Sequence, residues 1–191
     1  LIPDAIRQVD EVLSLFAAIL RVAEVESGET KRFFEPVDVT ALLNEVAESF
    51  SLAFEDVGRT FLWSIEPNLV VDGDRDLLAQ AMINLVENAQ RHPPAGTHVR
   101  KTAMSAHDLQ RLQVEDNGPG VPKADLARIT KRFARLEGSR NTAGHGLGLS
   151  LVSAVAKLHG GRLVLKSTKS GLSATIEIPK RAVSKPHPQA A

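Results

Sequence analysis

The sequence predicts an α+β fold: a two-layer sandwich in which a mixed sheet packs on three helices, preceded by one long bundle-type helix. Three observations support this prediction. The N-terminus carries a heptad-like apolar repeat, three later helical patterns have start and stop signals, and several short strand patterns follow one another as hairpins. Hairpin neighbours disfavour a doubly wound parallel sheet, because parallel strands need a crossover between them.

Apolar residues of the first helix recur at alternating spacings of four and three, as in the seam of a coiled coil or bundle. They are Ile2, Ile6, Val9, Leu13, Phe16, Leu20 and Ala23, and Val12, Leu15, Ile19 and Val22 widen the face toward a four-helix arrangement. A helix that packs on its own domain is the alternative. Because the chain begins inside this pattern, we expect residues 1–27 to be one helix of a bundle whose upstream part is missing.

The pattern divides the remaining chain into a linker with an edge strand (28–37), one domain (38–180) and a loose tail (181–191). Helices are expected at about 38–57, 75–92 and 147–159, and strands at 32–37, 59–65, 68–72, 99–105, 109–116, 162–168 and 173–178. Asp38 and Asp74 are expected to cap helices, and residues 107–108 to turn a hairpin. The residues expected to point inward are Leu42, Leu43, Val46, Phe50, Leu78, Met82, Leu85, Val86 and Ala89.

Composition limits the classes of partner. Lysine plus arginine equals aspartate plus glutamate at 23 each, so nothing general favours nucleic acid or an anionic membrane. Cysteine is absent, which excludes disulfides and thiolate zinc sites and suits a reducing compartment such as the cytoplasm. No apolar run approaches the ~18 residues that span a bilayer. Whether the parent protein is anchored in a membrane by other segments is left open.

One stripe of the helix expected at 75–92 is polar. Asn84, Glu87, Asn88 and Arg91 fall at i, i+3, i+4 and i+7 and therefore share a face. Carboxamide and carboxylate oxygens suit a hard cation such as Mg²⁺, and Arg91 with His92 could reach phosphate or sugar. Taken alone, such a stripe is more often the solvated face of a helix.

Two glycine-rich segments follow. Asp116 ends a strand directly before Asn-Gly-Pro-Gly. Its carboxylate could accept a hydrogen bond from the exocyclic amine of a ligand, while the glycine backbone passes close to a planar ring. A simple tight turn is the alternative. Residues 144–149 open a helix with free N–H groups suited to an anion. This segment matches neither a Walker loop nor a dinucleotide fingerprint. Between the two, Arg132, Arg135 and Arg140 suit a phosphate-sensing cover or an ordinary basic loop.

Taken in order, these segments resemble the catalytic domain of two-component sensor histidine kinases, whose ATP-binding fold is shared with the gyrase, Hsp90 and MutL group. Residues 84–89 and 116–120 are similar to the N and G1 boxes, and residues 132–136 and 144–150 to the F and G2 boxes. The first helix resembles the second helix of the dimerisation and phosphotransfer domain. The resemblance covers nearly the whole chain, and the four boxes together are highly specific.

The resemblance implies roles for individual residues, with ATP and Mg²⁺ bound. Asp116 would bind the adenine amine with Ser173 as helper, Asn88 and Asn84 would hold Mg²⁺ and phosphates, and Glu87 would be the general base or orient water. Arg91 and His92 would line the phosphate and sugar side, and Arg132, Arg135 and Arg140 would be lid cations. The lid and phosphate cradle would comprise Gly118, Gly120, Gly144, His145, Gly146, Leu147, Gly148 and Leu149.

The implied reaction transfers the γ-phosphoryl group of ATP to a histidine on a helix absent from this chain, for relay to a response-regulator aspartate. The parent would be a homodimer through the bundle, with the joint around residues 27–32 as hinge. No histidine lies on the first helix, so the chain alone is not expected to phosphorylate itself.

Two alternatives are retained. His145 replaces a small hydroxyl residue and Ala174 an aromatic one, which supports a non-catalytic nucleotide-binding scaffold. An ATPase or serine kinase on the same fold is disfavoured by the bundle-type helix.

Overall fold

The computed structural model describes residues 16, 19–20, 23–27, 34–56, 59–91, 98–131, 146–168 and 171–181. Its strands are β1 (Glu35–Asp38), β2 (Thr60–Ile65), β3 (Val70–Gly73), β4 (His98–Ala106), β5 (Leu109–Asp116), β6 (Arg162–Thr168) and β7 (Gly171–Pro179). Its helices are α2 (Val39–Glu55), α3 (Arg75–Arg91) and α4 (Gly148–Leu158), with a short 3-10 turn at Lys123–Asp125. None of the helices in these ranges is long and apolar enough to cross a membrane.

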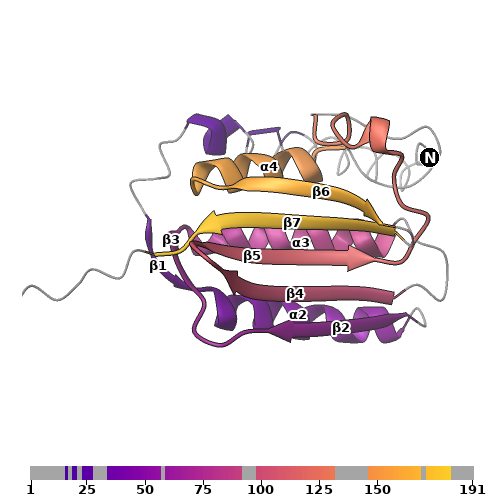
Figure 1. Cartoon of the computed structure of the whole chain (residues 1–191), viewed down its shortest axis with the longest axis horizontal. Helices are drawn as coiled ribbons and strands as arrows, with labels where there is room; N and C mark the ends of the chain where they lie inside the picture. The colour runs from indigo at the N-terminus through magenta and orange to yellow at the C-terminus, as the bar shows by residue number, and fades with distance from the viewer. Residues whose placement is uncertain are drawn as a thin grey trace, which may run out of the picture.

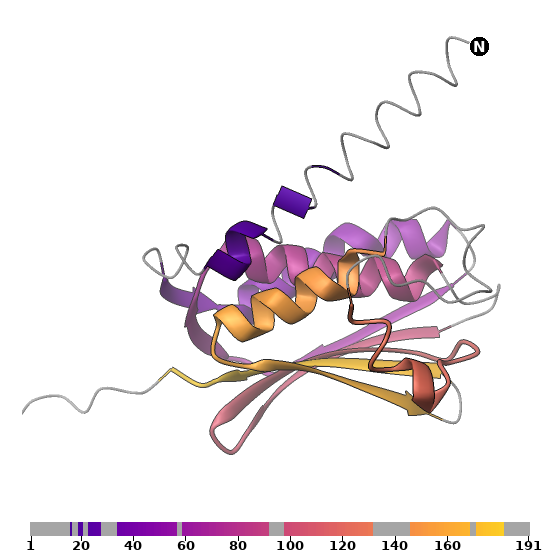
Figure 2. The same cartoon turned by 90° about the horizontal axis from the view of Figure 1, so that it is seen from above.

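The strands form a five-stranded sheet in the order β2-β4-β5-β7-β6 and a separate two-stranded sheet of β1 and β3 (Figure 1). The β2–β4 pair is parallel and the other pairs are antiparallel, so the large sheet is mixed. Helices α2, α3 and α4 all lie on one face of it (Figure 2). The predicted α+β fold of two layers is therefore confirmed.

Local signals place the helix starts and the hairpin as the sequence predicts. Asp38 accepts a hydrogen bond from the Ala41 amide at 3.0 Å, and Asp74 accepts one from the Leu77 amide at 2.9 Å. These bonds satisfy N–H groups that a first helical turn leaves unpaired. The β4–β5 hairpin turns at His107, whose φ of 49° is left-handed.

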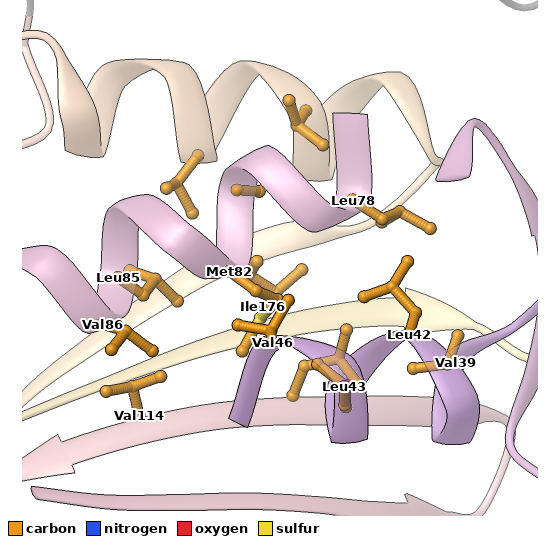
Figure 3. Close-up of a cluster of buried hydrophobic side chains, with 14 of the residues drawn as sticks. Val39, Leu42, Leu43, Val46, Leu78, Met82, Leu85, Val86, Val114 and Ile176 are labelled. Carbon is orange, nitrogen blue, oxygen red and sulfur yellow. The ribbon is translucent and has the colours of Figure 1, made fainter. Parts of the chain in front are cut away.

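The core lies between the helix layer and the inner face of the large sheet. Side chains of α2 and α3 converge there with Val114 of β5 and Ile176 of β7 (Figure 3). The residues predicted to point inward are buried, except Phe50, which is half-buried. Burial of this common apolar surface is the main force that holds the two layers together.

Several boundaries differ from the prediction. The edge strand expected at 32–37 is β1, and it pairs with β3 instead of joining the large sheet. The last strand starts at Gly171, two residues earlier than predicted. In the first helix, Phe16 and Leu20 are 60% and 48% exposed, whereas Val25 is buried in the core. Residues 1–15 and the tail from 182 lie outside the described residues.

The outer face of the sheet is polar. Glu177 of β7 accepts hydrogen bonds from Arg162 of β6 at 2.8 Å and from Arg111 of β5 at 3.1 Å. The hydrogen bond from Arg162 is the main reason that the pKa of Glu177 lies below its ordinary value. Paired charges allow this face to meet water without a second helix layer.

A lysine side chain lies inside the core. Lys101 of β4 is fully buried on the inner face, and its Nζ donates to the Leu43 carbonyl of α2 at 2.5 Å. Burial lowers the pKa of Lys101 from 10.5 to about 7, because a charge is poorly solvated there.

Lys101 should make the stability of the fold depend on pH. Between pH 7 and 10.5 the unfolded chain keeps a proton that the folded chain has lost, so the free energy of unfolding should rise with pH in that window. Lys101→Met should therefore stabilise the fold by about 1–3 kcal/mol at pH 7, with a smaller gain at pH 9.5. Urea unfolding at both pH values measures this. Lys166→Met, on the exposed outer face, is the control and should change little. A gain of equal size at both pH values would contradict the account.

Candidate functional site

The elements that carry the predicted site meet at one end of the sandwich. The C-terminal half of α3, the start of α4, the end of β5 and the start of β7 all lie at the right-hand end in Figure 1. Most of the residues singled out in the sequence and described by the structure fall on these segments. The site therefore lies between the sheet and the helix layer, at the edge where these helices and strands begin or end.

The polar stripe of α3 faces the start of α4. A Cβ atom added at Gly148 would lie 3.4 Å from Asn84 Oδ1 and 3.7 Å from Asn88 Nδ2. The amide nitrogen of Asn84 donates to the Gln80 carbonyl at 3.0 Å, which turns its oxygen toward Gly148. Glu87 is half-buried on the same stripe. Both carboxamides thus lie beside the first residue of a helix.

The first turn of α4 is arranged for an anion. Its N-cap is Leu147, which makes no side-chain capping hydrogen bond, and no acidic residue lies in the first turn. The N–H groups of that turn and the positive end of the helix dipole favour a negatively charged group. Leu147 is buried, which holds this turn against the fold, and Gly146 precedes it at a φ of 70°.

Asp116 is fixed at the end of β5. Its Oδ1 accepts from the Gly118 amide at 2.9 Å and, more weakly, from the Leu172 amide at 3.4 Å. The next residue, Asn117, accepts from the His98 amide at 2.6 Å and so ties the turn to β4. The carboxylate is therefore oriented by the turn and by β7 together.

Gly171, which lies between the last two strands expected from the sequence, is a structural part of this site. Its φ is 148°, and an added Cβ would lie 1.9 Å from the Asp116 carbonyl oxygen. Gly120 lies against it in turn, since its added Cβ would be 2.9 Å from the Gly171 carbonyl oxygen. The only sequence signal was a glycine at the start of a strand, which does not reveal its neighbour.

Ser173 is the predicted residue whose position disagrees with its role. It is paired with Glu115 in the β5–β7 register, so strand alternation places its side chain on the sheet face opposite that of Asp116. Asp116 shares its face with Leu112 and Val114, which belong to the core. The strand period separates the two side chains, and the helper role gains no support from the geometry.

The lid between the two glycine-rich segments is only partly described. Val121 and Ile129 are buried before it and Leu147 after it, so both ends are anchored in apolar contacts. Arg91 ends α3. The predicted residues His92, Arg132, Arg135, Arg140, Gly144 and His145 lie outside the described residues, and their roles remain predictions.

The donor set fits a metal ion shared with a ligand. Within the described ranges, no group of three or more His, Cys, Asp or Glu side chains could hold a metal ion. Mg²⁺ commonly takes one or two protein oxygens together with substrate phosphates. The Asn84 oxygen and the neighbouring Asn88 carboxamide, beside an anion-binding helix start, agree with that mode of binding and not with an all-protein cage.

Carboxamides at an uncapped helix start and an oriented carboxylate in a glycine turn together define a site for a nucleotide. A family profile described as "Histidine kinase-, DNA gyrase B-, and HSP90-like ATPase" matches residues 73–182. The chain belongs to this family and is an ATPase-type catalytic domain of the sensor histidine kinase class. The N, G1 and G2 segments all fall within the matched range.

Individual relatives of known class agree with this family assignment. The signal transduction histidine-protein kinase BaeS of Escherichia coli is 36% identical over 147 residues, covering 75% of this chain and 32% of BaeS. The sensor protein DivL of Caulobacter vibrioides is 35% identical, covering 91% of this chain and 22% of DivL. The chain thus spans about a third or less of either relative.

Among solved structures, the catalytic domain of histidine kinase ThkA gives a TM-score of 0.70 at 26% identity, covering 77% of this chain and 95% of ThkA's. Full-length ShkA in complex with AMPPNP gives a TM-score of 0.76 at 27% identity, covering 96% of this chain and 39% of ShkA. These likenesses confirm the predicted family and fold.

Gly171→Ala should destabilise the fold by about 2–4 kcal/mol, because the new Cβ has no room beside the Asp116 carbonyl. Gly160→Ala is the matched control. Gly160 also has a positive φ (72°), but its added Cβ would meet only Pro179 at 3.8 Å. It should cost about 1 kcal/mol from backbone strain alone. Thermal unfolding of both variants tests this, and equal losses would show that the close contact is unimportant.

Proposed function

We propose that this chain is the catalytic part of a sensor kinase that transfers the γ-phosphoryl group of ATP to a histidine on a bundle helix outside the chain. The observation that carries the proposal is the meeting of Asn84 and Asn88 with the start of α4, at the same end of the fold as Asp116. Similarity to ShkA, which was solved with AMPPNP, supports an adenine nucleotide as ligand.

The nucleotide would lie across this end with its phosphates at α4. The free N–H groups before Leu151 would bind phosphate oxygens, as helix N-termini do. At the other side, Asp116 would accept from the adenine amine, since Gly118 and Leu172 already hold its Oδ1 in place. The glycines at 118 and 120 let the ring pass close to the backbone.

Asn88 and Asn84 would hold Mg²⁺ through their oxygens, together with phosphate oxygens of the nucleotide. The ion would neutralise charge on the phosphates during transfer. The hydrogen bond from Asn84 to the Gln80 carbonyl holds its carboxamide in one direction before any ligand arrives, which limits the reorganisation that binding needs.

Glu87 would act on the proton of the acceptor histidine. In the reaction an imidazole nitrogen forms a bond to the γ-phosphorus, the bond from that phosphorus to the bridging oxygen of ADP breaks, and the imidazole gives up its proton. Glu87 lies one helical turn after Asn84 and directly before Asn88, and it would accept or orient that proton. The lid arginines 132, 135 and 140 would add positive charge at the γ-phosphate.

The first helix supplies the link to the acceptor. Phe16 and Leu20 are exposed on it, whereas Val25 packs in the catalytic core, so at least these two apolar side chains are open to contact with another helix. We assign residues 1–27 to the second helix of the dimerisation bundle, 28–37 to the linker and edge strand, 38–180 to the catalytic domain and 181–191 to a tail. The parent would dimerise through the bundle in the cytoplasm and pass the phosphoryl group to a response regulator.

Asp116→Asn tests the adenine contact without breaking the turn. Asparagine keeps Oδ1 for Gly118 but replaces the other oxygen by an amide donor, which repels the adenine amine. AMPPNP should bind at least about tenfold more weakly. The preference for ATP over GTP should also narrow, because guanine offers an acceptor at that position. Calorimetric titration with Mg²⁺ measures both.

Asp108→Asn, in the hairpin at the far end of β5, is the control and should bind normally. If Asp116→Asn retains full affinity and specificity at unchanged thermal stability, the adenine assignment is wrong.

Glu87→Gln tests the acceptor role. With a separately supplied bundle that carries the acceptor histidine, the rate of phosphotransfer should fall by about 10²-fold or more, while AMPPNP affinity stays within about twofold. Acid-labile phosphoprotein, followed over time, gives the rate. Glu48→Gln, exposed on α2, should leave the rate unchanged. Equal loss of binding and rate in Glu87→Gln would assign it to nucleotide binding instead.

A further inference from the structure

His159, the first residue after α4, is a buried histidine that ties this helix to the start of α3. Its Nε2 accepts a hydrogen bond from the Asp74 amide at 3.1 Å, so the ring proton lies on Nδ1, which donates to the Val155 carbonyl at 2.8 Å. Asp74 in turn caps the first turn of α3. The two imidazole bonds form a clamp, the His159 clamp, between the end of one helix and the start of the other.

The imidazole lies directly against the chain that enters α3. A Cβ atom added at Gly73 would lie 2.4 Å from His159 Cδ2 and 2.6 Å from its Nε2, so a side chain there would displace the ring. Gly73 is also paired with Glu35, the first residue of β1, which follows the linker. The clamp, the start of α3 and the strand after the linker therefore meet at one position.

Phe34, the residue that directly precedes β1, covers the His159 ring. The two rings stack with their centroids 4.6 Å apart and their planes inclined by 20°. A cavity of about 300 Å³ opens beside them, lined in part by Asp72 and Lys180. Without the phenyl ring this cavity would extend to the imidazole, and water would compete for the hydrogen bond between Nε2 and the Asp74 amide. Phe34 therefore protects the clamp.

The clamp and the candidate nucleotide site lie at opposite ends of the same pair of helices. Helices α3 and α4 pack side by side and run in opposite directions (Figures 1 and 2). The start of α3 and the end of α4 lie at the left in Figure 1, with β1 and β3, and the ends that carry the site lie at the right. Close-packed elements transmit displacement, so the spacing of Asn84 and Asn88 from Gly148 depends on the clamp.

We propose that Phe34 and His159 couple the linker to the nucleotide site. His159 is a positioning residue, because it holds α3 and α4 at the spacing that binds the nucleotide. Phe34 makes this spacing depend on the linker, so a movement of the first helix that withdraws Phe34 would loosen the helix pair and weaken nucleotide binding. The coupling rests on the nucleotide site proposed above, whereas the clamp can be tested without a nucleotide.

A double-mutant cycle on AMPPNP affinity tests whether Phe34 acts through His159. Phe34→Ala should weaken the binding of AMPPNP with Mg²⁺ about fivefold, at the low end of typical coupling between distant sites. In a His159→Leu background the same change should alter affinity less than about twofold, because the clamp is already lost. Phe34→Tyr keeps the stacked ring and should restore affinity to within about twofold of the unmodified chain. Calorimetric titration of the full chain measures each affinity.

Phe50→Ala is the matched control. Phe50 is likewise a partly buried phenylalanine that packs against the core, but it lies on α2 and not on the clamped pair. Its replacement should leave AMPPNP affinity within about twofold of the unmodified chain, and circular dichroism confirms that the variants fold. An equal loss of affinity in Phe50→Ala, or an equal effect of Phe34→Ala with and without His159, would overturn the proposal.

Hydrogen exchange of the nucleotide-free chain separates the coupling from the proposed function. In Phe34→Ala, amides in the C-terminal half of α3 and in α4 after its first turn should exchange about fivefold faster, with those of α2 changed less. If the unmodified chain fails to bind AMPPNP, the nucleotide site is contradicted, but faster exchange at these helix ends still supports the link between linker and helix pair. Unchanged exchange there would overturn that link even if AMPPNP binds.

Discussion

The fixed orientation of α3 about its long axis is the constraint on which the site depends. Seven apolar residues of this helix are buried: Leu77, Leu78, Ala81, Met82, Leu85, Val86 and Ala89. Figure 3 shows Leu78, Met82, Leu85 and Val86 in the core between the helices and the sheet. At 3.6 residues per turn, burying that stripe fixes the direction of every other side chain on the helix. The stripe with Asn84 and Asn88 must then face the start of α4. Hydrophobic burial, which has no direction of its own, thus orients two polar amides.

A second constraint acts at the end of the sheet, where backbone meets backbone. Gly171 approaches the Asp116 carbonyl so closely that no side chain fits between them, and Gly120 rests on Gly171. The antiparallel β5–β7 pair therefore holds the Asp116 turn in one arrangement. Since α3 and α4 pack on the same sheet, both halves of the nucleotide site share one rigid base, and binding needs little rearrangement of either.

The two faces and two edges of the sheet serve different needs. The inner face buries Lys101 beneath α2, at a cost in stability that depends on pH. The outer face meets water through the ion pairs of Glu177. The β6 edge exposes the charged residues Arg162 and Lys166, while the β2 edge exposes Leu62 and Trp63.

The sequence by itself determined the features that depend on neighbours along the chain. Helix caps at Asp38 and Asp74, the hairpin at His107, the buried stripes and the order of the family's boxes all follow from local spacing, and with them the fold class. Tertiary structure decided the rest: the parallel pairing of β2 with β4, the separate β1–β3 sheet, the contact of Gly171 with Asp116 and the face on which Ser173 lies. These features depend on which distant strands pair and in which register, and a one-residue shift reverses every side chain. Local sequence patterns do not predict the strand pairing or its register, because both are determined by packing across the whole sheet.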